Sequence, residues 1–273
     1  MLNSPRSFST VTSMMIGQHP ELYGMPELSL FLADTVGELM TDIWSPGYLA
    51  GLVRALAQCG FGNQKTESCL TSWQWLFNNR QMKTIEVFDM LQDLIKDKRI
   101  VEKSPTYVYD IKNLERLPKD ASFIHLVRHP ATYKKSLDDY FAFNKLPNSD
   151  PNYVLNSWIS NQNIIEDFLK DIPDDRKMLL KGEDVVQYPK IHLKKVCKFL
   201  GIDDSDYSIE FMMHPEYSPY ANKGNKWAEY GNDKYFCMQP ALRPSEVKPA
   251  TLKGLPDEVI NLATKYGYGD QNS

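Results

Sequence analysis

The chain has 273 residues, enough for one large domain or two small ones with a sizeable hydrophobic core. Its composition, 42% hydrophobic and 24% charged, is that of an ordinary globular protein. The formal net charge of −4 disfavours general nucleic-acid binding, which needs an excess of positive charge. No apolar run approaches the length of a membrane span, and no signal-peptide pattern begins the chain.

Cysteine and histidine usage bears on the compartment and on metals. The four cysteines form no CxxC pair and are too few for a disulfide scaffold, so we expect a reducing, cytoplasmic environment. The five histidines form no HExxH motif. We therefore expect no metal site.

Residues 4–10, SPRSFST, are the first informative stretch. A short extended piece with a proline leads into hydroxyl residues and then into an apolar stretch with helical spacing, which predicts a strand–loop–helix turn. Unpaired N–H groups at a helix start attract anions, so the turn predicts an anion-binding loop. The alternative is a helix cap beside a surface arginine. Only residues 1–3 remain for the strand, which indicates either a very short first strand or a segment cut from a longer polypeptide.

The next part of the chain is mainly helical. Two prolines and a glycine predict a loop over residues 18–28, which contains Glu27. The patterns that follow predict a helix over 30–40, an irregular helical insertion over 44–79 and an amphipathic helix over 82–97.

Strands and helices then alternate. We expect strands at 99–105, 122–128 and 177–181, and helices at 110–117, 130–141, 153–170 and 189–200, the last ending at Gly201. Such alternation indicates a parallel sheet with right-handed crossovers. Ligands bind at the carboxyl ends of such strands, where residues 4–10, 103–105 and 128–130 would meet.

The last part of the chain is less regular. Residues 203–250 are expected to form a loop-rich cover over the site, and residues 255–266 a final helix. There is no repeat and no convincing linker, so we expect one domain over residues 1–273. The predicted fold class is α/β, a three-layer sandwich with a central parallel sheet.

Six motifs in order resemble those of sulfotransferases that use 3′-phosphoadenosine-5′-phosphosulfate (PAPS), in their bacterial, assembly-line, tyrosylprotein and heparan branches. The motifs are SPRSFST (4–10), QHPELYGMPEL (18–28), VEKSPTYV (101–108), FIHLVRHPATYKKSLDDYF (123–141), LLKGEDVVQYPKIHLKKVCKFLGI (179–202) and NKGNKW (222–227). The resemblance covers nearly the whole chain. It implies the sulfotransferase fold, which is related to that of P-loop NTPases.

The resemblance also implies a binding site for PAPS and its product PAP. The 5′-phosphosulfate would lie against the loop residues Arg6, Ser7, Phe8, Ser9 and Thr10. The 3′-phosphate would be held by Arg128, Ser136, Lys223 and Gly224. The alternatives are a surface salt bridge for Arg128 and a solvated helix residue for Ser136.

For the chemistry, the resemblance implies in-line sulfuryl transfer to a hydroxyl group without a metal. Glu27 would act as the base, and Lys103 and Arg6 would stabilise the leaving phosphate. His214 and His129 are further candidate bases, although hydrogen-bonded loop histidines are the simpler interpretation. The acidic pair Glu183–Asp184 is expected to brace loops.

Three positions depart from the family pattern. Phe8 replaces a glycine of the loop, Asn222 replaces the arginine of an RKG motif, and Gly182 replaces a tyrosine. Phenylalanine in a loop that requires positive φ is strained, so a non-catalytic protein with impaired cofactor binding is the alternative function. A P-loop kinase is a weaker one, because the loop lacks the GxxxxGK[ST] pattern.

The predicted insertion and cover mix aromatic, apolar and amide residues. This favours a hydroxyl on a small molecule or a carrier-bound chain as the acceptor, because a long anionic polysaccharide would need a basic cleft.

Overall fold

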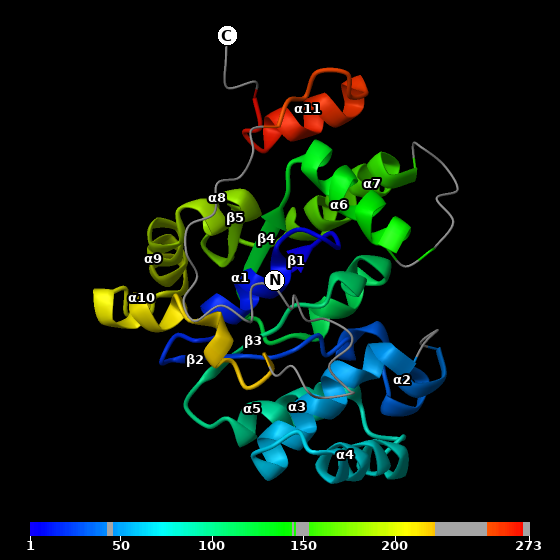
Figure 1. The fold of residues 1–273 in the computed structure, drawn as a ribbon. Helices are drawn as coiled ribbons and strands as arrows, with labels where there is room; N and C mark the ends of the chain where they lie inside the picture. The colour runs from blue at the N-terminus through cyan, green and yellow to red at the C-terminus, as the bar shows by residue number, and fades with distance from the viewer. Residues whose placement is uncertain (43–45, 144, 146–152, 222–249, 270–273) are drawn as a thin grey trace.

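The computed structural model describes residues 1–42, 46–143, 145, 153–221 and 250–269. Its centre is a parallel sheet in the order β1 (Leu2–Asn3), β4 (Phe123–Val127) and β5 (Lys177–Lys181). A second parallel pair joins β2 (Leu22–Gly24) to β3 (Arg99–Val101). The amino group of Met1 donates to the carbonyl oxygen of Glu102 at 2.7 Å, so the residue that follows β3 lies beside the start of β1. Figure 1 shows the two sheets and the helices around them.

Helices cover both faces of the sheet. All five residues of β4 are buried, as expected for a central parallel strand. One apolar cluster joins the sheet to α1 (Ser9–Ile16), α8 (Gly182–Gln187), α9 (Pro189–Leu200) and α10 (Asp206–Met212). Another joins β4 to α6 (Pro130–Phe143), α7 (Tyr153–Leu169) and α11 (Asp257–Lys265) on the other side (Figure 1). The predicted three-layer α/β sandwich is confirmed.

A group of helices lies below the sheet in Figure 1 and contributes to the largest apolar cluster. It comprises α2 (Val36–Asp42), η2 (Pro46–Leu49), α3 (Ala50–Phe61), α4 (Thr66–Asn78) and α5 (Thr84–Leu94). The stretch predicted to be an irregular insertion thus holds two regular helices. Each of these helices buries an apolar face, and this tertiary packing stabilises it. The apolar pattern is weak in the sequence because glycine and glutamine residues interrupt it.

Several other predictions need correction. The predicted loop over 18–28 contains β2. The helix expected over 30–40 is a 3₁₀ turn, η1 (Leu30–Leu32), followed by α2, because Ala33 between them is extended at φ −146°. The stretch 110–117 forms a 3₁₀ helix, η4 (Ile111–Arg116), after η3 (Pro105–Tyr109), and the strand expected to run to Pro105 ends at Val101.

In the predicted cover, α10 and the 3₁₀ turn η6 (Pro215–Tyr217) are described, and residues 222–249 lie outside the described part of the chain. The amino end of α10 is capped by Ser205, whose hydroxyl oxygen accepts from the Ser208 N–H at 3.3 Å. A further 3₁₀ turn, η5 (Asp174–Arg176), precedes β5. Gly201 ends α9 in the left-handed conformation at φ 63°, which confirms its predicted role.

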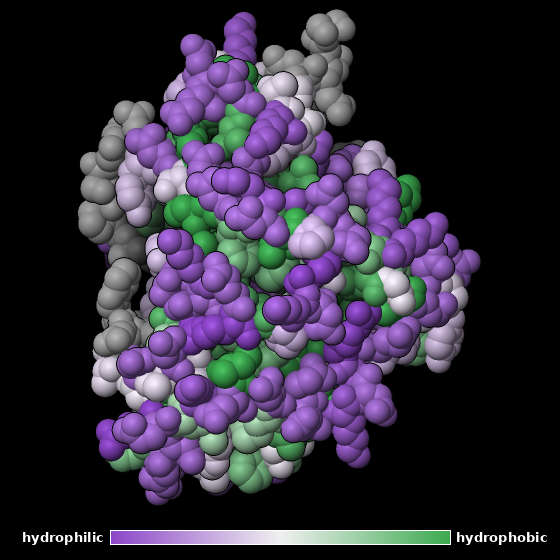
Figure 2. All heavy atoms as spheres, turned by 180° about the vertical axis from the view of Figure 1, so that it is seen from behind, coloured by the Kyte–Doolittle hydropathy of each residue, from purple (hydrophilic) through white to green (hydrophobic). Residues whose placement is uncertain are grey.

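Hydrophilic side chains divide the apolar surface of the rear face into separate patches (Figure 2). Within the described ranges, no helix combines the length and apolarity that crossing a membrane would require. The extent of a single domain over the whole chain stays a prediction.

Candidate active site

The turn between β1 and α1 has an unusual backbone. Arg6 and Phe8 both lie in the left-handed region, at φ 62° and φ 61°, where glycine is favoured. A non-glycine residue there costs about 1–2 kcal/mol. Phe8 therefore adopts the positive φ that a glycine at this position would adopt without strain.

Helix α1 begins directly after Phe8. The first N–H with an intrahelical acceptor is that of Thr12, which donates to the Phe8 carbonyl oxygen at 3.0 Å. The preceding N–H groups, from Ser9 onward, have no acceptor within the helix. The Ser7 hydroxyl is fully buried and has no hydrogen-bond partner among the described residues. Buried donors of this kind are suited to an anion such as a phosphosulfate.

Residues from two distant segments meet at this turn. Arg128 follows β4 and donates from Nη1 to the Arg6 carbonyl oxygen at 2.6 Å. Arg6 in turn donates from Nε to the hydroxyl of Ser136 on α6 at 3.2 Å. The structure therefore brings together Arg6, Arg128 and Ser136, which the resemblance assigned to the two charged ends of the cofactor. Both arginine side chains carry a permanent positive charge, so this part of the turn is electropositive.

A second charged group lies on the other side of the loop. Lys103 and Glu27 form an ion pair, and the lysine Nζ also donates to the Thr10 hydroxyl at 3.2 Å. The Lys103 side chain is 3% exposed and that of Glu27 is 26% exposed. The structure therefore joins the predicted base, the predicted lysine and the predicted anion loop through one buried ammonium.

The segment that carries Glu27 is anchored by neighbours that the sequence analysis missed. The Leu28 N–H donates to the Glu102 carboxylate at 3.2 Å, and the Ser29 N–H donates to the Ser104 hydroxyl at 3.0 Å. Burial raises the pKa of Glu102. Both anchoring side chains flank Lys103 in the VEKSPTYV motif, which is the signal that could have revealed them.

Gly51 on α3 is a further missed residue. A Cβ atom placed there would lie 1.9 Å from the Glu27 carbonyl oxygen. Only glycine therefore lets α3 pack directly against the backbone of Glu27. A glycine within a helix pattern gives no sequence signal for such a contact, because the contact is made by a distant segment.

The two candidate histidine bases have other partners. The His129 N–H donates to Glu183 at 2.9 Å, and its imidazole Nδ1 accepts from the Ala131 N–H at 3.2 Å. His214 pairs with Glu216 at 2.7 Å and stacks on Tyr217. These contacts favour hydrogen-bonded loop residues over bases.

Glu183 links three parts of the chain. Its carboxylate accepts from His129, from the Thr132 hydroxyl at 3.1 Å and from the Tyr268 hydroxyl at 2.9 Å. This carboxylate therefore braces the loop after β4 against the C-terminal segment. Two further residues were predicted to hold the 3′-phosphate, Lys223 and Gly224, and both lie outside the described residues. Asn222, which differs from the family pattern, lies outside them as well.

A cavity of about 420 Å³ lies elsewhere, beside β1, β3 and β4. Its lining includes Leu2 of β1, Arg99 of β3 and Phe123 of β4, and none of the candidate catalytic residues. The candidate site residues follow the carboxyl ends of the strands, where an open parallel sheet binds ligands.

The family model of the sulfotransferase family matches residues 2–206, and the chain therefore belongs to this family. The sulfotransferase domain from the Synechococcus PCC 7002 olefin synthase is similar in structure, with 28% identity and a TM-score of 0.77, over 98% of this chain and 93% of that one. The sulfotransferase domain from the curacin biosynthetic pathway matches with 23% identity and a TM-score of 0.80, over 98% and 96% of the two chains. No curated protein sequence matches this chain.

Proposed function

We propose that this protein transfers the sulfuryl group of PAPS to a hydroxyl group of a small-molecule or carrier-bound acceptor. One observation supports the proposal most directly: the buried Lys103 ammonium contacts both the anion-binding loop, at Thr10, and the carboxylate of Glu27. A phosphosulfate bound by the loop and a hydroxyl facing the carboxylate would then meet beside one positive charge.

The donor set fits PAPS at both of its charged ends. The loop from Arg6 to Thr10 offers the orphaned Ser7 hydroxyl and the first N–H groups of α1 for the 5′-phosphosulfate. Arg128 and Ser136 would hold the 3′-phosphate, together with Lys223 and Gly224. Charge-assisted hydrogen bonds from arginine are the strong contacts in such a site.

When bound, PAPS supplies the sulfuryl group and a phosphate leaving group. Glu27 removes the proton of the acceptor hydroxyl, which its partial exposure allows. Lys103 and Arg6 place positive charge where negative charge develops as the leaving phosphate departs. The protein contributes positioning and preorganised charge, as in phosphoryl transfer.

The acceptor class rests on the mixture of aromatic, apolar and amide residues in the predicted insertion and cover, and on the similarity to a sulfotransferase domain from an olefin synthase. The acceptor is then a hydroxyl on a carrier-bound chain or on a free small molecule. We further propose a cytoplasmic location, because the described cysteines Cys59, Cys69 and Cys197 are free thiols.

The cofactor is tested by calorimetric titration with PAP, the stable product. We expect saturable binding, and in Arg128→Ala a Kd raised about 10- to 100-fold, because one charged donor to the 3′-phosphate is lost. A titration with ATP–Mg²⁺ tests the kinase alternative. Absence of PAP binding by the wild-type chain would favour the non-catalytic alternative, for which the strained Phe8 is the specific observation.

The catalytic roles are tested by sulfuryl transfer from PAPS to a panel of free and carrier-bound hydroxyl acceptors. We expect Glu27→Gln to lower kcat about 10²- to 10⁴-fold, as for loss of a general base, with PAP affinity unchanged. Lys103→Met should lower kcat about 10²- to 10³-fold. The control is Glu67→Gln, an exposed carboxylate on α4. A loss of less than tenfold in Glu27→Gln would exclude it as the base.

A further inference from the structure

Two departures from the family pattern, Phe8 and Gly182, meet in space. Gly182 is the first residue of α8, directly after β5. A Cβ atom placed on Gly182 would lie 2.7 Å from Cδ2 of Phe8 and 2.7 Å from the Ser7 carbonyl oxygen. No side chain at position 182 fits while the phenyl ring of Phe8 and the Ser7 carbonyl oxygen occupy these places. The ring and the missing side chain are therefore one structural feature.

The same ring also faces the candidate 3′-phosphate arginine. The guanidinium carbon of Arg128 lies 4.2 Å from the centre of the Phe8 ring, which is within the range of a cation–π contact. The Arg128 guanidinium also donates two hydrogen bonds: Nε donates to the Thr132 hydroxyl at 3.1 Å, and Nη1 donates to the Arg6 carbonyl oxygen. The phenyl ring thus forms one wall of the place where the guanidinium lies.

The left-handed backbone of Phe8 makes this placement possible. At φ 61° and ψ 17°, Phe8 ends the loop and its side chain lies against α8 and Arg128 while the backbone begins α1. A strained residue persists when the surrounding structure over-determines it, and such residues cluster at functional sites. Here the contacts of the Phe8 ring with Gly182 and with Arg128 hold the residue in its strained conformation.

We propose that Phe8 is a positioning residue for the cofactor: its ring, seated in the space left by Gly182, orients Arg128 toward the 3′-phosphate of PAPS. The inference rests on the proposed function and deepens it. The side chain of Phe8 then contributes favourably to the free energy of cofactor binding, and this contribution offsets the strain of the Phe8 backbone.

The test compares two ligands by calorimetry: PAP, and adenosine 5′-phosphate, which lacks the 3′-phosphate. We expect Phe8→Leu, which removes the π face and keeps an apolar side chain, to raise the Kd of PAP about 5- to 20-fold. The Kd of adenosine 5′-phosphate should change less than twofold. A merely structural role of the ring would weaken both ligands equally, which would overturn the inference.

A double-substitution cycle tests the pairing with Gly182. Gly182→Tyr alone should raise the Kd of PAP more than about tenfold, because the new side chain collides with the ring and with the Ser7 carbonyl. Combining it with Phe8→Gly removes the ring and frees the loop backbone, so the Kd should return to within about threefold of the wild-type value. A double variant that binds no better than Gly182→Tyr would overturn the pairing.

The control is Phe77→Leu on α4. This change removes a ring whose centre lies 4.3 Å from the Arg80 guanidinium, a matched cation–π contact outside the site, and should leave both Kd values unchanged. Thermal melting of each variant shows whether it is folded. A wild-type chain that binds no PAP would refute the proposed function itself, whereas wild-type binding without a selective loss in Phe8→Leu would refute this inference alone.

Discussion

Burial differs sharply between the two members of the central ion pair. Lys103 is almost fully enclosed, whereas about a quarter of the Glu27 side chain is exposed. A buried ammonium needs its charge compensated, and here the carboxylate and the Thr10 hydroxyl do so. The exposed part of Glu27 leaves it accessible to an acceptor. The pair therefore combines a buried positive charge with a partly exposed carboxylate.

His125 on β4 makes a pH-dependent contribution to stability. Burial lowers its pKa from 6.5 to about 4, and its imidazole Nε2 lies 2.7 Å from the Gln162 amide oxygen. Because the pKa is lower in the folded state, the unfolded chain binds more protons between pH 6.5 and about 4. The free energy of unfolding therefore falls as the pH falls through this window, by about 2 kcal/mol from this residue between pH 7 and pH 5.

Urea unfolding of the wild type and of His125→Asn at both pH values measures this contribution. The variant cannot titrate at this position, so its free energy of unfolding should fall by about 2 kcal/mol less than that of the wild type over the same interval. Equal pH dependence in the two proteins would show that His125 is not the group responsible.

At the scale of elements, α3 determines where the segment of Glu27 lies. The contact of Gly51 with the Glu27 backbone leaves no room for a methyl group, whereas a Cβ atom placed on Gly60 of the same helix would meet nothing within 4 Å. The helix thus carries two glycines with opposite roles: one makes a close approach and the other only lowers helix stability.

We expect Gly51→Ala to lower kcat at least about tenfold, because it displaces the Glu27 backbone from its hydrogen-bonded position; misplacement by about 1 Å costs about 10²-fold in catalysis. Gly60→Ala is the matched control. It should raise the free energy of unfolding by about 0.5–1 kcal/mol and leave kcat unchanged. Sulfuryl-transfer assays and urea unfolding of both variants measure these effects, and equal kcat in the two would contradict a positioning role for α3.

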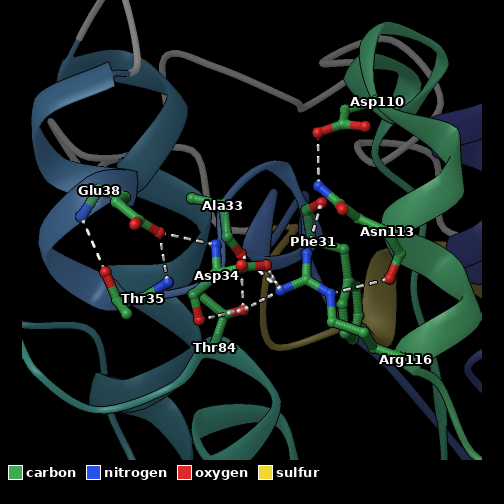
Figure 3. Close-up of polar contacts among 9 residues, drawn as sticks. All are labelled: Phe31, Ala33, Asp34, Thr35, Glu38, Thr84, Asp110, Asn113 and Arg116. Atoms are coloured by element: carbon green, nitrogen blue, oxygen red, sulfur yellow. Dashed lines mark hydrogen bonds and ion pairs between the residues drawn. The ribbon is translucent and has the colours of Figure 1, made fainter.

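At the scale of the whole molecule, Arg116 joins the helices below the sheet to the η4 segment (Figure 3). Its guanidinium donates to the carbonyl oxygens of Phe31 and Ala33, at 3.3 and 3.0 Å, and pairs with Asp34 at 2.6 Å. The same group lies near the Thr84 hydroxyl at the start of α5. One side chain therefore ties η1, α5 and η4 together.

Arg116→Gln should lower the free energy of unfolding by about 2–3 kcal/mol. The reason is that the carbonyl groups of Phe31 and Ala33 accept from a charged donor in the wild type and lose that donor in the variant. The control is Lys112→Gln, an exposed lysine of the same η4 segment, which should change the free energy by less than about 0.5 kcal/mol. Urea denaturation measures both. An equally small change in the free energy of unfolding of the two variants would show that hydrogen bonds to water replace the Arg116 contacts without loss of stability.

The sequence by itself predicted the α/β class, the central parallel sheet and the loop after the first strand. It could do so because hydrophobic periodicity, proline and glycine positions and helix ends are local signals, as at β4 and at Gly201. It also predicted that Arg6, Lys103 and Arg128 follow the carboxyl ends of strands, where ligands bind in open parallel sheets.

Only the tertiary structure decided how those residues meet. The sequence could not show that Lys103 pairs with Glu27, that Gly51 admits the Glu27 backbone, or that the ring of Phe8 fills the space over Gly182. It also missed β2 and α10, whose short stretches are stabilised by distant partners rather than by their own periodicity. The physical reason is common to all of them: each depends on contacts between segments far apart in the chain, and local patterns carry no record of the partner.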